Sequence, residues 1–115
     1  MKIIKYWFPL FLYSGIIFGV SAIPNVKVPY SGMNFDKVLH TLLYLPYGFL
    51  LARALGHSQV NVTKKMLLLA VVIFSLAYGI SDEFHQVFVP GRSAGFDDAF
   101  ADMVGGAIGG LVYLR

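Results

Sequence analysis

Four long apolar segments, separated by short polar connections, make up most of this 115-residue chain. We expect helices at roughly 4–23, 36–55, 64–85 and 97–114. Because an α-helix rises about 1.5 Å per residue, segments of this length reach across a hydrocarbon layer about 30 Å thick. Charged residues make up 13% of the chain, whereas they are about a quarter of an ordinary soluble domain. We therefore predict an all-α, polytopic membrane protein, a four-transmembrane-helix bundle that forms one domain over residues 1–115.

The first apolar segment also fits a second interpretation. Two lysines precede it, and the small residues at 20–22 resemble a cleavage site, as in a secretory signal peptide. However, the apolar run from Tyr6 to Ile23 is longer than the apolar region typical of a signal peptide. We expect this segment to be retained as the first helix.

The composition narrows the range of partners and bound groups. The chain has no cysteine, which excludes a disulfide framework and a thiolate metal site. Its formal net charge is +3, but the nine Lys and Arg are scattered, so no nucleic-acid partner is expected. Membrane lipid is the expected partner. Glycines spaced four apart at 105–109 and 106–110 favour close helix packing, either within one chain or in a homo-oligomer.

The basic residues predict how the chain is oriented. Six lie on one side of the expected spans, namely Lys2, Lys5, Arg53, Lys64, Lys65 and Arg115. Three lie on the other side, namely Lys27, Lys37 and Arg92. Because connections rich in Lys and Arg stay in the cytoplasm, we expect both termini to be cytoplasmic.

The acidic residues gather on one side of the membrane. They fall at or near the outer ends of the second, third and fourth expected helices, at Asp36, Asp82, Glu83, Asp97, Asp98 and Asp102. His40 and His85 lie at the same level, and Asp36, His40, Tyr44 and Tyr47 share one helix face. Polar groups inside a membrane are costly unless they have a partner or line a cavity. This convergence therefore predicts a site at the outer face.

The residue types leave several roles open for this site. His40, Asp82, Glu83 and Asp102 can act together as interhelical hydrogen-bonding groups without any ligand. His40, Glu83 and His85 are able to bind a divalent metal ion, although no two histidines are spaced four apart. The same three side chains are candidate acids and bases for chemistry on a phosphate-bearing substrate.

Two cations complete the candidate set. Lys37 and Arg92 can neutralise an anionic group of a ligand or substrate. Neutralisation of this kind serves a catalysed reaction and simple recognition equally well. The spacing of the residues does not separate these two roles.

Three groups of residues resemble the VanZ-like family. They are Asp36-Lys37-x-x-His40-x-x-x-Tyr44-x-x-x-Gly48, then Ser81-Asp82-Glu83-Phe84-His85-Gln86 with Pro90-Gly91-Arg92, and then Asp98-x-x-x-Asp102-x-x-Gly105. The groups follow in the family's order from Asp36 to the C-terminus. One departure is Asp102, where the family usually has asparagine, so this chain carries an additional acid near the site.

The resemblance implies a small multi-pass protein of the bacterial cell membrane, in a family whose namesake confers resistance to the lipoglycopeptide teicoplanin in Gram-positive bacteria. The convergence of polar residues at the outer face suggests an outward-facing polar cleft that binds a cell-envelope lipid, a lipid-linked precursor or a lipoglycopeptide. The alternative is a membrane-embedded hydrolase or transferase that acts on a lipid-linked or phosphate-bearing substrate, with or without a metal ion. The expected binding residues are Asp36, Lys37, His40, Tyr44, Asp82, Glu83, His85, Gln86, Arg92, Asp98 and Asp102.

Overall fold

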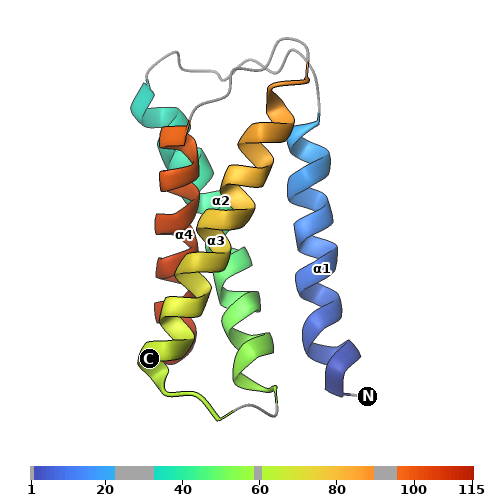
Figure 1. Ribbon diagram of the computed structural model, residues 1–115, viewed down its shortest axis with the longest axis vertical. Coiled ribbons are helices and arrows are strands. Elements are labelled where there is room, and N and C mark those ends of the chain that lie inside the picture. The colour runs from blue at the N-terminus through green and yellow to red at the C-terminus, as the bar shows by residue number, and fades with distance from the viewer. Residues whose placement is uncertain (1, 23–32, 59–60, 90–95) are drawn as a thin grey trace.

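The computed structural model describes residues 2–22, 33–58, 61–89 and 96–115, apart from the side chains of residues 2, 33–36 and 96. This part of the chain forms four helices and no strand: α1 (Lys2–Ser21), α2 (Met33–Gly56), α3 (Lys64–Gln86) and α4 (Phe96–Leu114). The helices form a bundle of 43 × 26 × 20 Å, and neighbours in sequence run in opposite directions (Figure 1). The expected all-α fold is confirmed.

Three of the described helices are long and apolar enough to cross a membrane. The spans are Ile3–Ser21, Lys37–Gly56 and Lys64–Gln86. α4 has 19 residues, but its first two turns include three acids, at Asp97, Asp98 and Asp102. These acids reduce the apolar length of α4, which is not among the three spans. The chain has the helices of a membrane protein, and three of those described meet the length and polarity required of a span.

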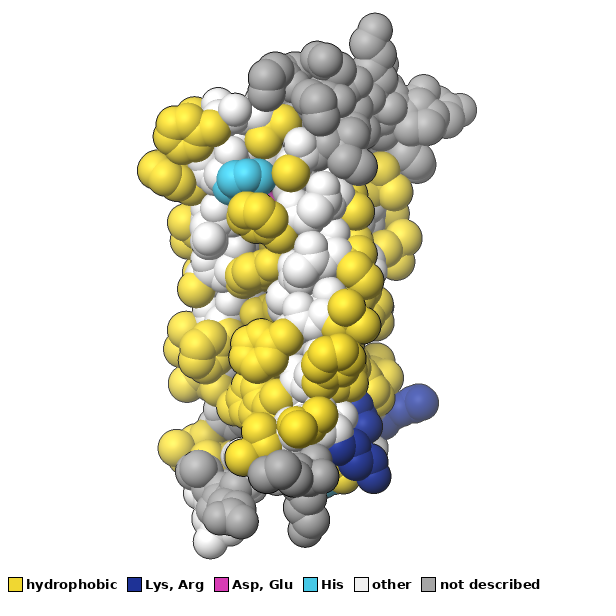
Figure 2. All heavy atoms as spheres, turned by 90° about the vertical axis from the view of Figure 1, so that its right-hand side faces the viewer, with side chains coloured by type: hydrophobic (Ala, Val, Ile, Leu, Met, Phe, Trp, Pro, Cys, Tyr) yellow, Lys and Arg dark blue, Asp and Glu magenta, His cyan; other side chains and the backbone are white. Residues whose placement is uncertain are grey.

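Large apolar side chains cover the outside of the bundle. Phe8 and Phe11 of α1 and Leu69 of α3 are each more than half exposed. The space-filling view shows hydrophobic side chains over most of the face on which α1 lies, with Lys and Arg near one end (Figure 2). Contiguous apolar surface on this scale is unfavourable in water and favourable against lipid chains. The surface of the bundle is therefore suited to a membrane.

Glycines bring α4 into direct backbone contact with α2. A Cβ atom added at Gly48 would overlap the backbone of Gly106, and one added at Gly105 would overlap the carbonyl oxygen of Thr41. Gly109 meets the backbone of α2 one turn further along. Helices approach this closely only where no side chain stands between them. The glycine pattern therefore packs within one chain, with Gly105 and Gly109 against α2 and Gly106 and Gly110 against α3.

Hydrogen bonds to backbone carbonyls attach α1 to the bundle. Tyr13 of α1 donates to the carbonyl oxygen of Leu43 over 2.5 Å, and Tyr78 of α3 donates to that of Ser14 over 2.5 Å. Ile17, in the next turn of α1, is fully buried. Inside a membrane such hydrogen bonds help to hold helices together, because lipid chains offer no partner. The part of α1 from Tyr13 to Ile17 is thereby held against α2 and α3.

Candidate functional site

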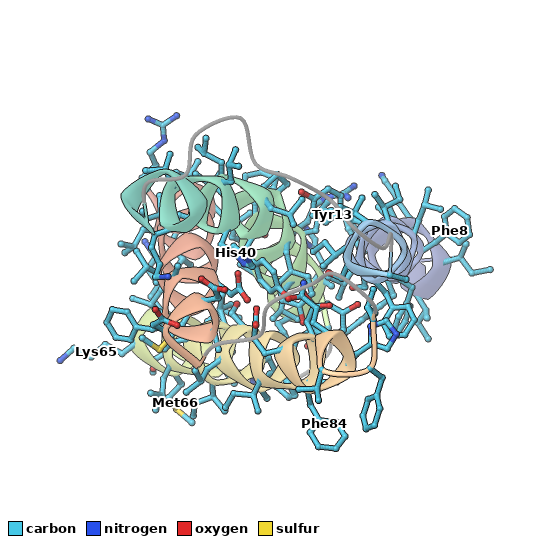
Figure 3. The ribbon with its side chains drawn as sticks, turned by 90° about the horizontal axis from the view of Figure 1, so that it is seen from above. Phe8, Tyr13, His40, Lys65, Met66 and Phe84 are labelled. Carbon is cyan, nitrogen blue, oxygen red and sulfur yellow. The ribbon has the colours of Figure 1, made fainter. Side chains whose placement is uncertain are left out.

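Polar side chains meet at the end of the bundle opposite both termini. This end holds the last turns of α1 and α3 and the first turns of α2 and α4 (Figure 1). Seen from above, His40 points into the interior between α2, α3 and α4, toward a group of side-chain oxygens (Figure 3). We call this group the polar cluster, and it consists of His40, Asp82, Glu83, Gln86, Asp98 and Asp102.

Helical spacing places the members of the polar cluster on inward faces. On α3, Asp82, Glu83 and Gln86 lie within about one turn, and each is at most 3% exposed. On α4, Asp98 and Asp102 are 6% and 0% exposed. Side chains three or four residues apart share a helix face. Four acidic side chains are therefore buried at one end of a bundle with an apolar exterior.

Asp102 holds the imidazole ring of His40. His40 Nδ1 lies 2.8 Å from Asp102 Oδ1, while His40 Nε2 lies 3.9 Å from Asp98 Oδ2. A carboxylate at one ring nitrogen fixes the orientation of the ring and the position of its proton. The other nitrogen then faces the interior of the polar cluster. The second oxygen of Asp102, Oδ2, is buried and has no hydrogen-bond partner among the described residues.

Lys37 closes one side of the polar cluster. Its Nζ atom lies 2.9 Å from Asp97 Oδ2 and 2.8 Å from Asp98 Oδ1. The side chain of Asp97 is 61% exposed, so this contact forms the rim of the cluster and joins α2 to α4. Asp97 was not among the expected binding residues. In this arrangement the ammonium group is already shared by two carboxylates.

Ser21 is a neighbour of the polar cluster that the sequence did not indicate. Its Oγ atom donates to Asp82 Oδ2 over 2.8 Å, and both side chains are buried. The two residues are 61 positions apart, and the surroundings of Ser21 in the sequence resemble a cleavage site. No spacing signal links residues at such a separation. α1 therefore contributes to the site through a contact that only the folded chain reveals.

Three tyrosines form an aromatic layer beneath the polar cluster. Tyr44 is fully buried, and its ring centre lies 5.5 Å from that of Tyr47 and 6.1 Å from that of Tyr78. Tyr47 and Tyr78 stack with their ring centres 5.2 Å apart. The hydroxyl group of Tyr44 has no hydrogen-bond partner within the described part of the chain. Tyr44 thus lies next to the cluster and not within it.

The structure does not bring His85 into the polar cluster. Its ring packs against that of Phe18 in α1, with the centres 4.2 Å apart. Glu83 and His85 are two residues apart on one helix, which turns their side chains about 200° away from each other. By contrast, His40, Glu83 and Asp98 each present a potential metal ligand within 4.8 Å of the other two. The arrangement thus favours Asp98 over His85 as the third member of a metal-binding set.

Two of the expected binding residues fall outside this description. Asp36 lies in the first turn of α2, but its side chain is not among those described. Arg92 belongs to residues 90–95, which are also outside the described ranges. Among the other expected residues, Tyr44 lies beneath the polar cluster, Lys37 at its rim and His85 beyond it. The rest form the cluster itself.

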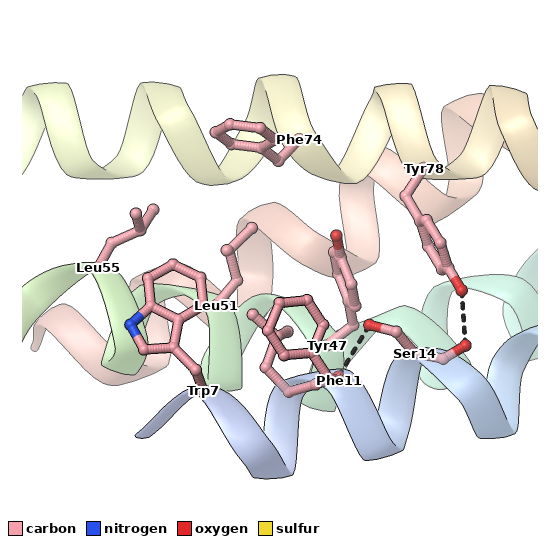
Figure 4. A pocket seen from close by; sticks show the side chains of 9 residues that line it. Trp7, Phe11, Ser14, Tyr47, Leu51, Leu55, Phe74 and Tyr78 are labelled. Atoms are coloured by element: carbon pink, nitrogen blue, oxygen red, sulfur yellow. Dashed lines mark hydrogen bonds between the residues drawn. The ribbon is translucent and has the colours of Figure 1, made fainter. Parts of the chain in front are cut away.

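An apolar cleft of about 290 Å³ lies between α1, α2 and α3 (Figure 4). Its lining residues are Trp7, Leu10, Phe11, Ser14, Tyr47, Leu51, Leu55, Phe74 and Tyr78. Tyr78 precedes Asp82 by one turn of α3, and Ser14 precedes Ser21 by two turns of α1. The hydrogen bond from Tyr78 to the Ser14 carbonyl crosses the end of the cleft nearer the polar cluster (Figure 4). The cleft therefore lies below the cluster, with Tyr47 and Tyr78 between them.

Comparison with known proteins supports the resemblance seen in the sequence. The chain matches the VanZ/LLP1 family over residues 3–115. No curated protein and no solved structure gives a significant match. The family match includes α1, whereas the motifs that resemble the family begin only at Asp36. The chain belongs to the VanZ/LLP1 family.

Proposed function

We propose that the polar cluster binds the head group of a cell-envelope lipid or lipid-linked precursor, and that the apolar cleft takes part of the lipid chain. The observation that carries this proposal is the position of the cleft below the cluster, with Tyr47 and Tyr78 between them. An amphipathic ligand needs adjoining polar and apolar sites. Phe11 and Phe74 at the edge of the cleft are each more than half exposed, so a lipid can enter it sideways from the membrane.

The proposal places all four helices across a bacterial cell membrane, with both termini in the cytoplasm and the polar cluster at the outer face. The long axis of the bundle is 43 Å, which is close to the thickness of a bilayer with its head groups, about 40–45 Å. Arg53, Lys64 and Lys65 lie at the end that holds the termini, and basic residues favour the cytoplasmic side. In this orientation α4 has its acids outside and its apolar residues in the membrane.

Single cysteines test this orientation, because the chain has none of its own. Phe88→Cys, at an exposed position near the polar cluster, is expected to react with a membrane-impermeant thiol reagent in intact cells. Asn61→Cys, in the exposed connection between α2 and α3, is expected to react only after the membrane is opened. The reverse pattern of labelling would show that the polar cluster faces the cytoplasm.

Filling the cleft is expected to weaken lipid binding. Purified protein in detergent is titrated with a fluorescent phospholipid and with a polyprenyl phosphate, which share a phosphate head group and an apolar chain. Ser14→Phe is expected to weaken binding about tenfold, since displacing two buried methylene groups costs about 0.8 kcal/mol each. Gly15→Phe adds the same side chain one residue away, where space is open, and is expected to leave the affinity unchanged. Equal affinity of both variants for the lipid would show that the lipid chain does not occupy the cleft.

The same titration addresses the link to glycopeptide resistance. We propose that teicoplanin, a lipoglycopeptide, competes for this site through its lipid chain. Teicoplanin is then expected to displace the fluorescent lipid from the unmodified protein, and to bind Ser14→Phe less well. Absence of displacement would confine the proposed ligands to membrane lipids and lipid-linked precursors.

A second candidate function is hydrolysis of, or transfer from, a phosphate-bearing lipid. The contact between His40 Nδ1 and Asp102 Oδ1 favours it, because a carboxylate at one ring nitrogen suits the other to accept a proton. Product analysis after prolonged incubation of lipid with protein separates the two functions. Turnover that His40→Ala abolishes supports an enzyme, whereas unchanged lipid supports binding alone.

A further inference from the structure

Among the described residues, the polar cluster holds four acids and one histidine. Its four acids are each at most 6% exposed, and His40 is the one described histidine among them. Lys37 at the rim is already shared by Asp97 and Asp98. Carboxylates buried this close together cannot all ionise unless a positive charge compensates them. A divalent ion bound among these side chains would supply positive charge at this point.

We propose that His40, Glu83 and Asp98 bind one divalent ion of the first transition row, and that Asp102 orients His40 for this role. The three ligand side chains each present a nitrogen or oxygen atom within 4.8 Å of the other two. His40 Nε2 and Asp98 Oδ2 are 3.9 Å apart. This separation fits two ligands on one ion, because metal–ligand distances are about 2.0–2.2 Å.

Asp102 gives a second reason to place a metal ion here, and this reason does not depend on the number of acids in the cluster. Its Oδ1 atom contacts His40 Nδ1, which is how a carboxylate commonly holds a metal-binding histidine. Its Oδ2 atom is buried and has no hydrogen-bond partner among the described residues. Asp102 also presents a ligand atom within 4.8 Å of those of Asp82 and Glu83. Buried polar atoms are rarely left without a partner, and an ion or an ion-bound water would satisfy this one.

The ligand set indicates which ions suit the site. One imidazole nitrogen with two carboxylates suits Zn²⁺, Mn²⁺ or Fe²⁺, whereas Mg²⁺ and Ca²⁺ prefer oxygen ligands alone. The chain has no cysteine to favour a soft ion such as Cu⁺. A bound divalent ion would reverse the local charge and attract a phosphate group. The attraction of a phosphate group is the part of this inference that rests on the proposed function.

Zinc binding by the purified protein tests the proposal. After EDTA treatment and reloading with Zn²⁺, elemental analysis is expected to give one retained ion per chain. His40→Ala and Glu83→Gln are expected to lose the ion, and Asp102→Asn to bind it about 10- to 100-fold more weakly. His57→Ala is the matched control, since His57 is exposed at the opposite end of the bundle, and it is expected to keep the ion.

The His85→Ala variant separates this ligand set from one built on His40, Glu83 and His85. We expect it to retain the ion, because His85 faces Phe18 of α1. Failure of the unmodified protein to retain zinc, or equal loss from His85→Ala and His40→Ala, would overturn the assignment. Glu83→Gln preserves the size of the side chain, so a folded Glu83→Gln protein that keeps the ion would overturn it as well.

Lipid titration of EDTA-treated protein distinguishes this inference from the proposed function. If zinc is retained but no lipid binds, the metal site stands and the proposed function fails. If lipid binds equally well to the metal-free protein and no zinc is retained, the metal site fails and the proposed function stands. Lipid binding that EDTA abolishes and Zn²⁺ restores supports both.

Discussion

Replacing Gly48 by alanine is expected to destabilise the folded protein by about 3 kcal/mol, the upper part of the usual range for overpacking. The added Cβ atom would overlap the backbone carbonyl of Gly106, which cannot swing aside as the end of a flexible side chain can. α2 and α4 must therefore separate or rotate, and the contacts on either side of Gly48 weaken. Denaturant titration of the purified protein in mixed micelles, followed by circular dichroism, measures this loss.

Glycines of α1 provide the matched control for Gly48→Ala. At Gly15 and Gly19 an added Cβ atom would meet only open space. Alanine is favoured over glycine inside a helix by about 1 kcal/mol, so Gly15→Ala and Gly19→Ala are expected to preserve or raise stability. If Gly48→Ala behaved like these two controls, the close packing of α2 against α4 would be wrong.

Asp102→Ala is expected to destabilise the protein by about 3 kcal/mol, because removing one partner of a buried pair leaves the other poorly compensated. The substitution deletes the 2.8 Å contact to His40 Nδ1 and opens a cavity at a fully buried position. Denaturant titration in the presence of EDTA measures the effect without any contribution from a bound metal ion. The double variant His40→Ala/Asp102→Ala is expected to lose less than the sum of the two single losses, as contacting residues do.

Two further variants show whether the loss comes from this buried contact. Asp97→Asn removes an acid from the same helix at a side chain that is 61% exposed, and exposed ion pairs contribute about 1 kcal/mol at most. Asp102→Asn keeps the size of the side chain and one acceptor oxygen, and asparagine is the residue that the family resemblance implies here. We expect the loss of stability in Asp102→Asn to lie between those in Asp97→Asn and Asp102→Ala. A loss in Asp97→Asn as large as that in Asp102→Ala would contradict this account.

The helical fold was predictable because long apolar runs have few ways to satisfy their backbone in a membrane other than as helices. Helical spacing also indicated that His40 and Tyr44 share one face of their helix, and that Asp98 and Asp102 share one face of theirs. In the structure both pairs point into the bundle. The acids, His40 and His85 were expected near one end, and the described ones among them lie there.

The rotation of each helix about its own axis was not predictable. In a soluble protein the apolar stripe of a helix marks its buried face, but lipid and protein interior are both apolar, so this signal is lost in a membrane. Asp82 and His85 are three residues apart on α3, and both contact α1. Asp82 receives a hydrogen bond from Ser21, and His85 packs on Phe18. Only the packing of α1 against α3 determines which contact each side chain makes.

One of the bonds that hold α1 in place makes few demands on the sequence of α1. The Tyr78 hydroxyl binds the backbone carbonyl of Ser14, an acceptor that every residue type offers. Tyr13 in turn donates to the backbone carbonyl of Leu43. A change of side chain at position 14 or 43 therefore leaves these attachments intact as long as both helices persist. Position 14 of α1 can thus vary without loss of its bond to Tyr78, whereas Tyr13 and Ser21 hold α1 through their own side chains.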